Sequence, residues 1–295
     1  MKNLIFLLFV ITILSVSCVN KNQKTDEKRV VATTSMIADI ARNIAQDLLT
    51  VEQILPVGTD PHIYEPTPRD AQLVARAQVL LMNGLTLEGW LGKLIENAGG
   101  KAAVTVCSDG VAPIGSEIHK NSFDPHAWMT AENGITYAKN IANAFAKFDP
   151  ENAAFYQKNC EIYIEKLRSL DGYIKKRVTE IPESQRILIT SHDAFQYFGR
   201  AYGLRLESIL GTSTEADAQT SDVQRVTNLI KIQKIKAVFV ESTVNPKLLE
   251  QISSDNQVKI GGKLFSDSLG DSTSGADTYL NFLKKNADVI VDGLK

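Results

Sequence analysis

The chain has 295 residues, of which 44% are hydrophobic, and its formal net charge at pH 7 is -2. A chain of this size can bury a sizeable core, and its length favours two domains over one. The near-neutral charge provides no excess of positive charge for binding nucleic acid or an anionic membrane surface. The sequence also lacks a P-loop, a dinucleotide fingerprint and a serine nucleophile elbow.

Residues 1–17 have the features of an export signal. Lys2 supplies the positive end, Leu4 to Leu14 form an apolar run, and small residues precede Cys18. The apolar run is too short to span a bilayer, for which about twenty residues are needed. The segment resembles a bacterial lipoprotein signal, and a plain secretory signal with an incidental cysteine is the alternative. We expect Cys18 to be lipidated and the polar residues 18–29 to form a flexible tether.

Short apolar runs then alternate with amphipathic stretches. Strands are predicted at Val30 to Thr33, Val51 to Leu55, Val79 to Met82 and Ala103 to Val106. The segments between the first three pairs of strands are predicted to be helices, and Pro68 suits a first helical turn. A further helix is predicted from about Glu132 to Phe145. This alternation is typical of a parallel sheet, so residues 30–148 are expected to form an N-terminal α/β lobe.

One uninterrupted helix pattern runs from Pro150 to Ile181. Apolar residues recur along it at spacings of three and four, from Tyr156 to Val178, and Pro182 follows. At 1.5 Å per residue this helix would be roughly 45 to 50 Å long, which exceeds a single small domain. Residues 149–182 are therefore expected to link two lobes.

The alternation resumes in residues 183–295. Its predicted strands are Ile187 to Thr190, Leu204 to Ile209, Ala237 to Val240 and Val258 to Phe265. Its predicted helices lie near Ala194 to Tyr202, Asp222 to Gln233, Pro246 to Ser253 and Ala276 to Ile290. The predicted fold class is α/β, with two lobes of central, mainly parallel sheets flanked by helices and joined by one long helix.

If Cys18 is acylated, two cysteines remain in the mature chain, Cys107 and Cys160. An oxidising compartment would allow them to form a disulfide. However, Cys107 ends a strand-like run and Cys160 lies on an apolar helical stripe, so we expect two separate buried thiols.

Two of the four histidines, His62 and His126, end the same tripeptide, Asp-Pro-His. Proline stiffens the loop that presents each imidazole. His192 directly follows a strand-like run and Asp267 follows another, and three imidazoles with a carboxylate suit a divalent transition metal. Ligands bind outside the carboxyl ends of strands in such sheets, so the predicted site lies in the cleft between the lobes. Taken singly, each residue could instead be a hydrogen-bonded loop or turn residue.

Other residues near these histidines have more ordinary interpretations. Asp60, Asp124 and Asp193 are candidates to accept the second ring proton of a metal-bound imidazole, or are simply turn residues. His119 stands in a polar loop outside any motif and is not included in the site. The neighbouring aromatic residues are expected to pack around the cleft: Tyr64, Trp128, Phe195 and Tyr197.

Four segments carry a resemblance to a known family: Gly58–Pro68, Asp124–Trp128, His192–Phe198 and Asp267–Gly270. Together they resemble the solute-binding lipoproteins of zinc and manganese ABC importers, and their order and spacing agree from about Val30 to the C-terminus. The resemblance implies two α/β lobes joined by one long helix that limits closure to a small tilt. It implies metal ligation by the side chains at these four motifs: His62, His126, His192 and Asp267.

The same resemblance implies partners and a location. The partners are an ABC permease and its ATPase, and the protein is held to the bacterial membrane by its lipid anchor, facing the periplasm or the extracellular side. We expect a monomer. Two alternatives stay open: a surface adhesin or host-factor binder, as suggested for some relatives, and a zinc hydrolase. Four protein ligands would fill the coordination of the ion, whereas a catalytic zinc keeps a position open for water.

The identity of the metal is not settled by the ligand types. Zinc binds nitrogen and oxygen ligands more tightly than manganese does. On the other side, many zinc-specific relatives carry a histidine-rich loop where residues 111–124 contain one histidine, while manganese-specific relatives often have glutamate in place of His192. We favour manganese over zinc as the transported ion and expect zinc to bind tightly in vitro.

Overall fold

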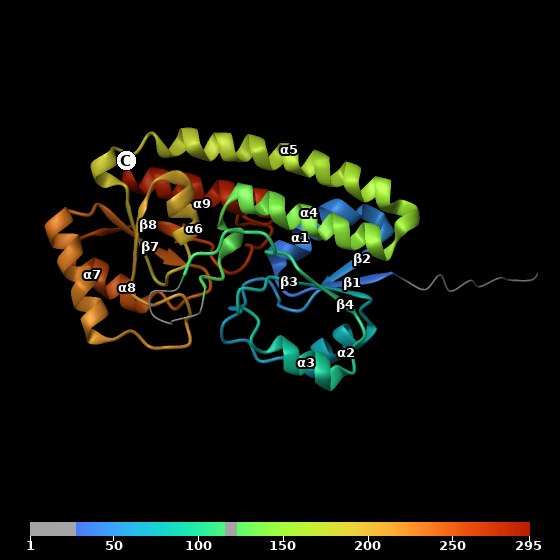
Figure 1. The fold of residues 1–295 in the computed structure, drawn as a ribbon. Coiled ribbons are helices and arrows are strands. Elements are labelled where there is room, and N and C mark those ends of the chain that lie inside the picture. The colour runs from blue at the N-terminus through green and yellow to red at the C-terminus, as the bar shows by residue number, and fades with distance from the viewer. Residues whose placement is uncertain (1–27, 116–122) are drawn as a thin grey trace, which may run out of the picture.

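The computed structural model describes residues 28–115 and 123–295. Two lobes lie side by side, each built around a four-stranded parallel sheet (Figure 1). The first sheet has the strand order β2-β1-β3-β4 and the second the order β6-β5-β7-β8. The predicted α/β fold class is therefore confirmed. Cys18 and His119 lie outside the described residues.

In the first lobe the apolar runs form strands close to the predicted bounds. The strands are β1 (Arg29–Ala32), β2 (Thr50–Gln53), β3 (Val79–Met82) and β4 (Ala103–Val106). The helices are α1 (Ser35–Ala45), α2 (Pro68–Arg76), α3 (Leu91–Ala98) and α4 (Ala131–Phe148), and a 3₁₀ turn (Gln46–Leu48) follows α1. Helix α2 begins as predicted with Pro68 in its first turn, where Thr67 and Asp70 form a capping box.

The second lobe has the same organisation. Its strands are β5 (Ile187–Thr190), β6 (Arg205–Ser208), β7 (Ala237–Glu241) and β8 (Lys259–Leu264). Its helices are α6 (Gln196–Tyr202), α7 (Thr220–Gln233), α8 (Lys247–Asn256) and α9 (Tyr279–Leu294). Gly199 of α6 faces β6, and a Cβ at this position would come within 1.9 Å of the Leu206 side chain. Only glycine allows this helix to lie so close to the sheet.

Helix α5 (Ala153–Val178) runs along both lobes beside α4 and α9 (Figure 1). The predicted helix is longer than the observed one, because Pro150–Asn152 forms a 3₁₀ turn and the chain turns again after Val178. The 26 residues of α5 span roughly 39 Å. Its buried face contains the predicted apolar residues from Tyr156 to Val178.

A single hydrophobic core runs through both lobes. Val30 and Ile141 of the first lobe, Leu167 of α5, and Leu188 and Phe239 of the second lobe belong to one continuous cluster. Smaller clusters cover the opposite face of each sheet. Because each sheet is buried on both faces, its central strands are almost uniformly apolar, as expected for parallel sheets. The lobes are thus joined by packed side chains as well as by the chain itself.

The two remaining cysteines are separate thiols, as predicted. Cys107 and Cys160 are both buried and free. Cys107 belongs to the first lobe and Cys160 to α5. Burial raises the pKa of both thiols, so neither is a reactive thiolate at neutral pH.

Candidate metal centre

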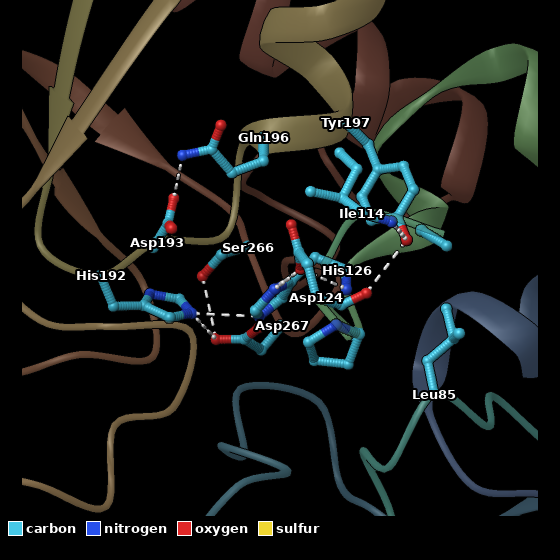
Figure 2. A network of polar contacts seen from close by, with 12 residues as sticks. Leu85, Ile114, Asp124, His126, His192, Asp193, Gln196, Tyr197, Ser266 and Asp267 are labelled. Atoms are coloured by element: carbon cyan, nitrogen blue, oxygen red, sulfur yellow. Dashed lines mark hydrogen bonds and ion pairs between the residues drawn. The ribbon is translucent and has the colours of Figure 1, made fainter. Parts of the chain in front are cut away.

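Four side chains converge at the carboxyl ends of the strands, between the lobes. His62 follows β2, His126 follows β4, His192 follows β5 and Asp267 follows β8. The Nε2 atom of His126 lies 3.2 Å from that of His62 and 3.3 Å from that of His192. One ligand atom of each of the four residues lies within 4.8 Å of the others. Figure 2 shows His126, His192 and Asp267 pointing toward one another.

His62 is held by the turn that precedes it. Its backbone N–H donates to Asp60 Oδ1 at 2.9 Å, and Trp90 Nε1 donates to the carbonyl of Pro61. The other oxygen of Asp60 accepts a hydrogen bond from Thr214 of the second lobe at 2.6 Å. Asp60 therefore fixes the loop and contacts the opposite lobe, and no hydrogen bond joins it to the imidazole ring. His62 is the ligand candidate nearest to solvent, with its side chain 5% exposed.

His126 has a carboxylate behind its ring. Asp124 Oδ1 accepts from the backbone N–H of His126 at 2.9 Å and lies 2.7 Å from Nδ1. Asn83, at the end of β3, donates to the carbonyl of Pro125 and holds this loop to the sheet. Because Asp124 accepts the Nδ1 proton, Nε2 is the nitrogen that faces the site, and its lone pair is available to a metal when the ring is neutral. Asp124 thus has the first of the two roles considered from the sequence, that of a partner for the imidazole.

His192 also has a carboxylate behind it, but this is Glu241 and not Asp193. Glu241 Oε1 accepts from the backbone N–H of His192 at 2.8 Å, and Glu241 Oε2 lies 2.7 Å from Nδ1. The second contact is an ion-pair distance without the alignment of a hydrogen bond. Asp193 instead accepts from Gln196, as Figure 2 shows. The sequence does contain one signal for Glu241. It is an acidic residue at the end of a buried strand, β7.

Asp267 lies in a loop that contacts both lobes. The backbone carbonyl of Ser266 accepts from Trp128 Nε1 at 2.8 Å, and the N–H of Leu269 donates to Ser35 Oγ at 3.0 Å. Gly58 donates to Ser268 Oγ at 2.7 Å. These bonds place a second-lobe carboxylate beside the histidines of the first lobe.

The aromatic residues near the site fill space, as predicted. Trp128 is buried with its ring 5.2 Å from the ring of His126, centroid to centroid. Phe195 is buried in the shared core. The hydroxyls of Tyr64 and Tyr197 bond to Asp70 and to the carbonyl of Asp124. None of these interactions points a polar aromatic atom at the histidine cluster.

Burial and charge act against each other in the pKa values of these groups. Burial lowers the pKa of His62 to about 3, and the nearby Asp267 offsets only part of that effect. Burial also lowers the pKa of His126, but Asp124 and then Asp267 outweigh it and raise the pKa to about 9. The pKa of Asp267 is well below its usual value, because His192 and His126 outweigh burial, which raises it. The Asp267 carboxylate is therefore ionised and able to bind a cation.

The spacing of the ligand atoms fits a divalent ion. Metal–ligand distances near 2.0 to 2.1 Å place neighbouring ligands of a tetrahedron roughly 3.3 to 3.4 Å apart. The Nε2 atoms of His62 and His192 lie 3.2 and 3.3 Å from that of His126, and Asp267 Oδ1 lies 3.3 Å from His126 Nε2 and 3.8 Å from His62 Nε2. Oδ1 is buried and has no hydrogen-bond partner. A cation between these atoms would provide the partner that Asp267 Oδ1 lacks.

A family model described as "Zinc-uptake complex component A periplasmic" matches residues 30–293. The chain belongs to this family. The match covers both lobes and all four converging side chains. The predicted resemblance to the solute-binding lipoproteins of zinc and manganese importers is confirmed.

Similar proteins agree with this membership over nearly the whole chain. The metal ABC transporter substrate-binding lipoprotein SsaB of Streptococcus sanguinis is 38% identical over 289 residues, which cover 94% of each chain. The manganese ABC transporter substrate-binding lipoprotein PsaA of Streptococcus mitis is 38% identical over 302 residues, 98% of this chain and 97% of the relative. The solved structure of the periplasmic zinc-binding protein TroA of Treponema pallidum has a TM-score of 0.86 at 32% identity, covering 91% of this chain and 99% of its own.

Proposed function

We propose that this protein captures one divalent transition metal ion, Mn²⁺ or Zn²⁺, between its lobes and delivers it to the permease of an ABC importer. The ligands in this proposal are His62, His126, His192 and Asp267. The observation that carries it is the convergence of three imidazole nitrogens and an unpartnered, buried carboxylate oxygen within 4.8 Å of one another. The family consists of substrate-binding proteins of ABC importers, so the role is binding and not catalysis.

The position of the cluster suits capture and release. Two ligand candidates come from each lobe, so a change in the angle between the lobes separates His62 and His126 from His192 and Asp267. A cavity of about 380 Å³ lies beside the cluster and is lined by residues of both lobes, among them Asp60, Ile63 and Thr243. Two of these lining residues, Asp60 and Ile63, flank His62 in the sequence, and His62 is the ligand candidate nearest the surface.

The location of the protein is part of the proposal. Cys18 would carry the lipid that anchors the chain, with residues 18–29 as the tether, so that a monomer works on the outer side of the cytoplasmic membrane beside the permease and its ATPase. The names of the similar lipoproteins support the anchor. Among the described residues, no helix is long and apolar enough to cross a membrane.

The transported ion is proposed to be manganese, with zinc binding more tightly to the isolated protein. Nitrogen ligands favour zinc by the Irving–Williams order. The similar proteins include one named for manganese and one for zinc. An importer transports the ion that is available to it and that the binding protein releases to the permease. The ion that binds more tightly in vitro therefore need not be the transported ion.

The experiment that tests the ligand assignment compares two histidine variants of the mature chain. An ion present at a hundred times its dissociation constant should stabilise the folded protein by roughly 2.7 kcal/mol and raise the melting temperature. His126→Ala should abolish this shift in melting temperature. It should also abolish the content of one metal ion per chain that mass spectrometry measures. His119→Ala, which changes a histidine outside the motifs, is the matched control and should retain both. A full shift in His126→Ala would disprove the assignment.

A further inference from the structure

The two oxygens of the Asp267 carboxylate have different surroundings. Oδ2 accepts hydrogen bonds from Thr243 Oγ1 and from Ser266 Oγ, each at 3.1 Å. Oδ1 accepts none, although it is buried, and it faces the Nε2 atoms of His126 and His62 at 3.3 and 3.8 Å. The carboxylate therefore presents Oδ2 to the two hydroxyl groups and to His192, and Oδ1 to the imidazoles of His126 and His62.

Both hydroxyl groups are held in place by the fold. Thr243 follows β7 by two residues, and its Oγ1 lies 3.3 Å from Ser266 Oγ. Ser266 is fully buried, and its carbonyl accepts from Trp128 Nε1. Each hydroxyl has a single proton to donate, and an ionised carboxylate can only accept, so both protons are best used on Oδ2. Two such bonds oppose rotation of the carboxylate.

The position of Oδ2 makes this restraint relevant to metal binding. Oδ2 lies 3.4 Å from His192 Nε2, which is the ligand–ligand spacing of the cluster itself. Without its two donors, Oδ2 is close enough to bind the same ion as Oδ1 after a small rotation. Zinc in closed protein sites is four-coordinate, whereas manganese is a harder ion that prefers oxygen ligands and a higher coordination number.

We infer that Thr243 and Ser266 determine metal preference by keeping Asp267 a one-oxygen ligand. The two hydroxyls occupy Oδ2, so the site offers three nitrogens and one oxygen, an arrangement that favours zinc over manganese. Both are positioning residues, because they act through Asp267 and lie outside the proposed set of four ligands. This inference rests on the proposed function, since it concerns the same ion.

The test compares three variants of the full mature chain. Thr243→Val removes the hydroxyl at nearly constant shape, Thr243→Ser keeps it, and Ser266→Ala removes the second donor. The dissociation constants for Zn²⁺ and Mn²⁺ are measured by competition with a chelator at fixed pH. Thr243→Val and Ser266→Ala should each shift the preference toward manganese by roughly tenfold, within the range seen when groups supporting a metal ligand are changed. Thr243→Ser should match the wild type.

Cobalt(II) provides a second readout that a general loss of packing would not imitate. Four-coordinate cobalt absorbs visible light much more strongly than cobalt with five or six ligands. The absorption per bound ion should therefore fall in Thr243→Val and stay unchanged in Thr243→Ser. If Thr243→Val does not fold, Ser266→Ala alone decides the question by the same two measurements.

The outcomes separate this inference from the proposed function. An unchanged zinc-to-manganese ratio with an unchanged cobalt spectrum in Thr243→Val or Ser266→Ala would overturn the inference. So would an equal weakening of both metals, or a Thr243→Ser variant that behaves like Thr243→Val. All three results leave metal binding by the wild type intact. Failure of the wild-type protein to bind any of these ions would instead refute the proposed function itself.

Discussion

Replacing Asp124 with asparagine should weaken metal binding about tenfold above about pH 9, where the imidazole of His126 is neutral. Asp124 Oδ1 lies 2.7 Å from His126 Nδ1, and both side chains are buried, so the carboxylate supports a positive charge on the far side of the ring. A hydrogen bond to a charged group contributes about 1.5 to 3 kcal/mol, and a neutral one about 0.5 to 1.5 kcal/mol. The difference, roughly 1 to 1.5 kcal/mol, corresponds to about a factor of ten in affinity.

The pH dependence of this loss is a second signature. Asp124 also raises the pKa of His126 to about 9, so at neutral pH a proton competes with the metal for that imidazole. Removing the carboxylate charge lowers this pKa and reduces the competition. Each unit by which this pKa falls offsets a factor of ten in affinity near neutral pH. The tenfold loss should therefore be measured above about pH 9 and should be offset near neutral pH.

Asp193→Asn is the matched control for Asp124→Asn. Both aspartates lie next to a proposed ligand, but Asp193 bonds Gln196 and makes no hydrogen bond to an imidazole ring. Competition with a chelator, repeated from neutral to alkaline pH, should show wild-type affinity for Asp193→Asn. Equal losses in the two variants, or no loss in Asp124→Asn at high pH, would refute the reasoning that the carboxylate acts through the ring.

Three further predictions concern protons, anchoring and release. The pKa values of His126 and His192 are raised, that of His126 to about 9, while the pKa of His62 is lowered to about 3. Metal binding at neutral pH should therefore release protons from His126 and His192 and none from His62, and affinity should rise with pH through about 9. Calorimetry in buffers of different ionisation enthalpy measures this release, and zero release would contradict the prediction. Cys18→Ser should move the protein from the membrane to a soluble fraction, since lipid chains provide the anchor; equal membrane retention of both forms would count against lipidation. Asp267→Ala should increase the rate at which metal dissociates to a chelator in stopped flow and leave the association rate similar, because related variants differ mainly in their dissociation rates. A variant in which only the association rate falls would disprove this.

The sequence predicted the lobes and the converging residues because those features depend on local patterns. Apolar runs of four residues gave the strands, and the repeated Asp-Pro-His identified His62 and His126. The partner of His192 could not be predicted in the same way. Asp193 is its neighbour in sequence, whereas Glu241 reaches it from another strand, 49 residues away. Which strands are neighbours in a parallel sheet is decided by the tertiary fold, here by the pairing of β5 with β7.

The hydroxyl contacts of Asp267 depend on the fold in the same way. Thr243 lies 24 residues before Asp267, and a threonine after a strand has no feature that indicates such a contact. The length of α5 was overestimated because Pro150 is compatible with both an α-helix and a 3₁₀ turn. The apolar spacing identifies the buried face of a helix better than it identifies the ends.

The shared core has a consequence for how this protein unfolds. Proteins with two lobes often behave as two domains that melt separately, each protected by its own interior. Here Val30 and Leu188, which lie in different sheets, belong to one cluster that also includes Leu167 of α5. Opening either lobe would expose the apolar surface of the other, so the two should denature in one cooperative transition. An ion bound between the lobes would then protect the entire molecule against proteases and heat, including strands far from the ligands.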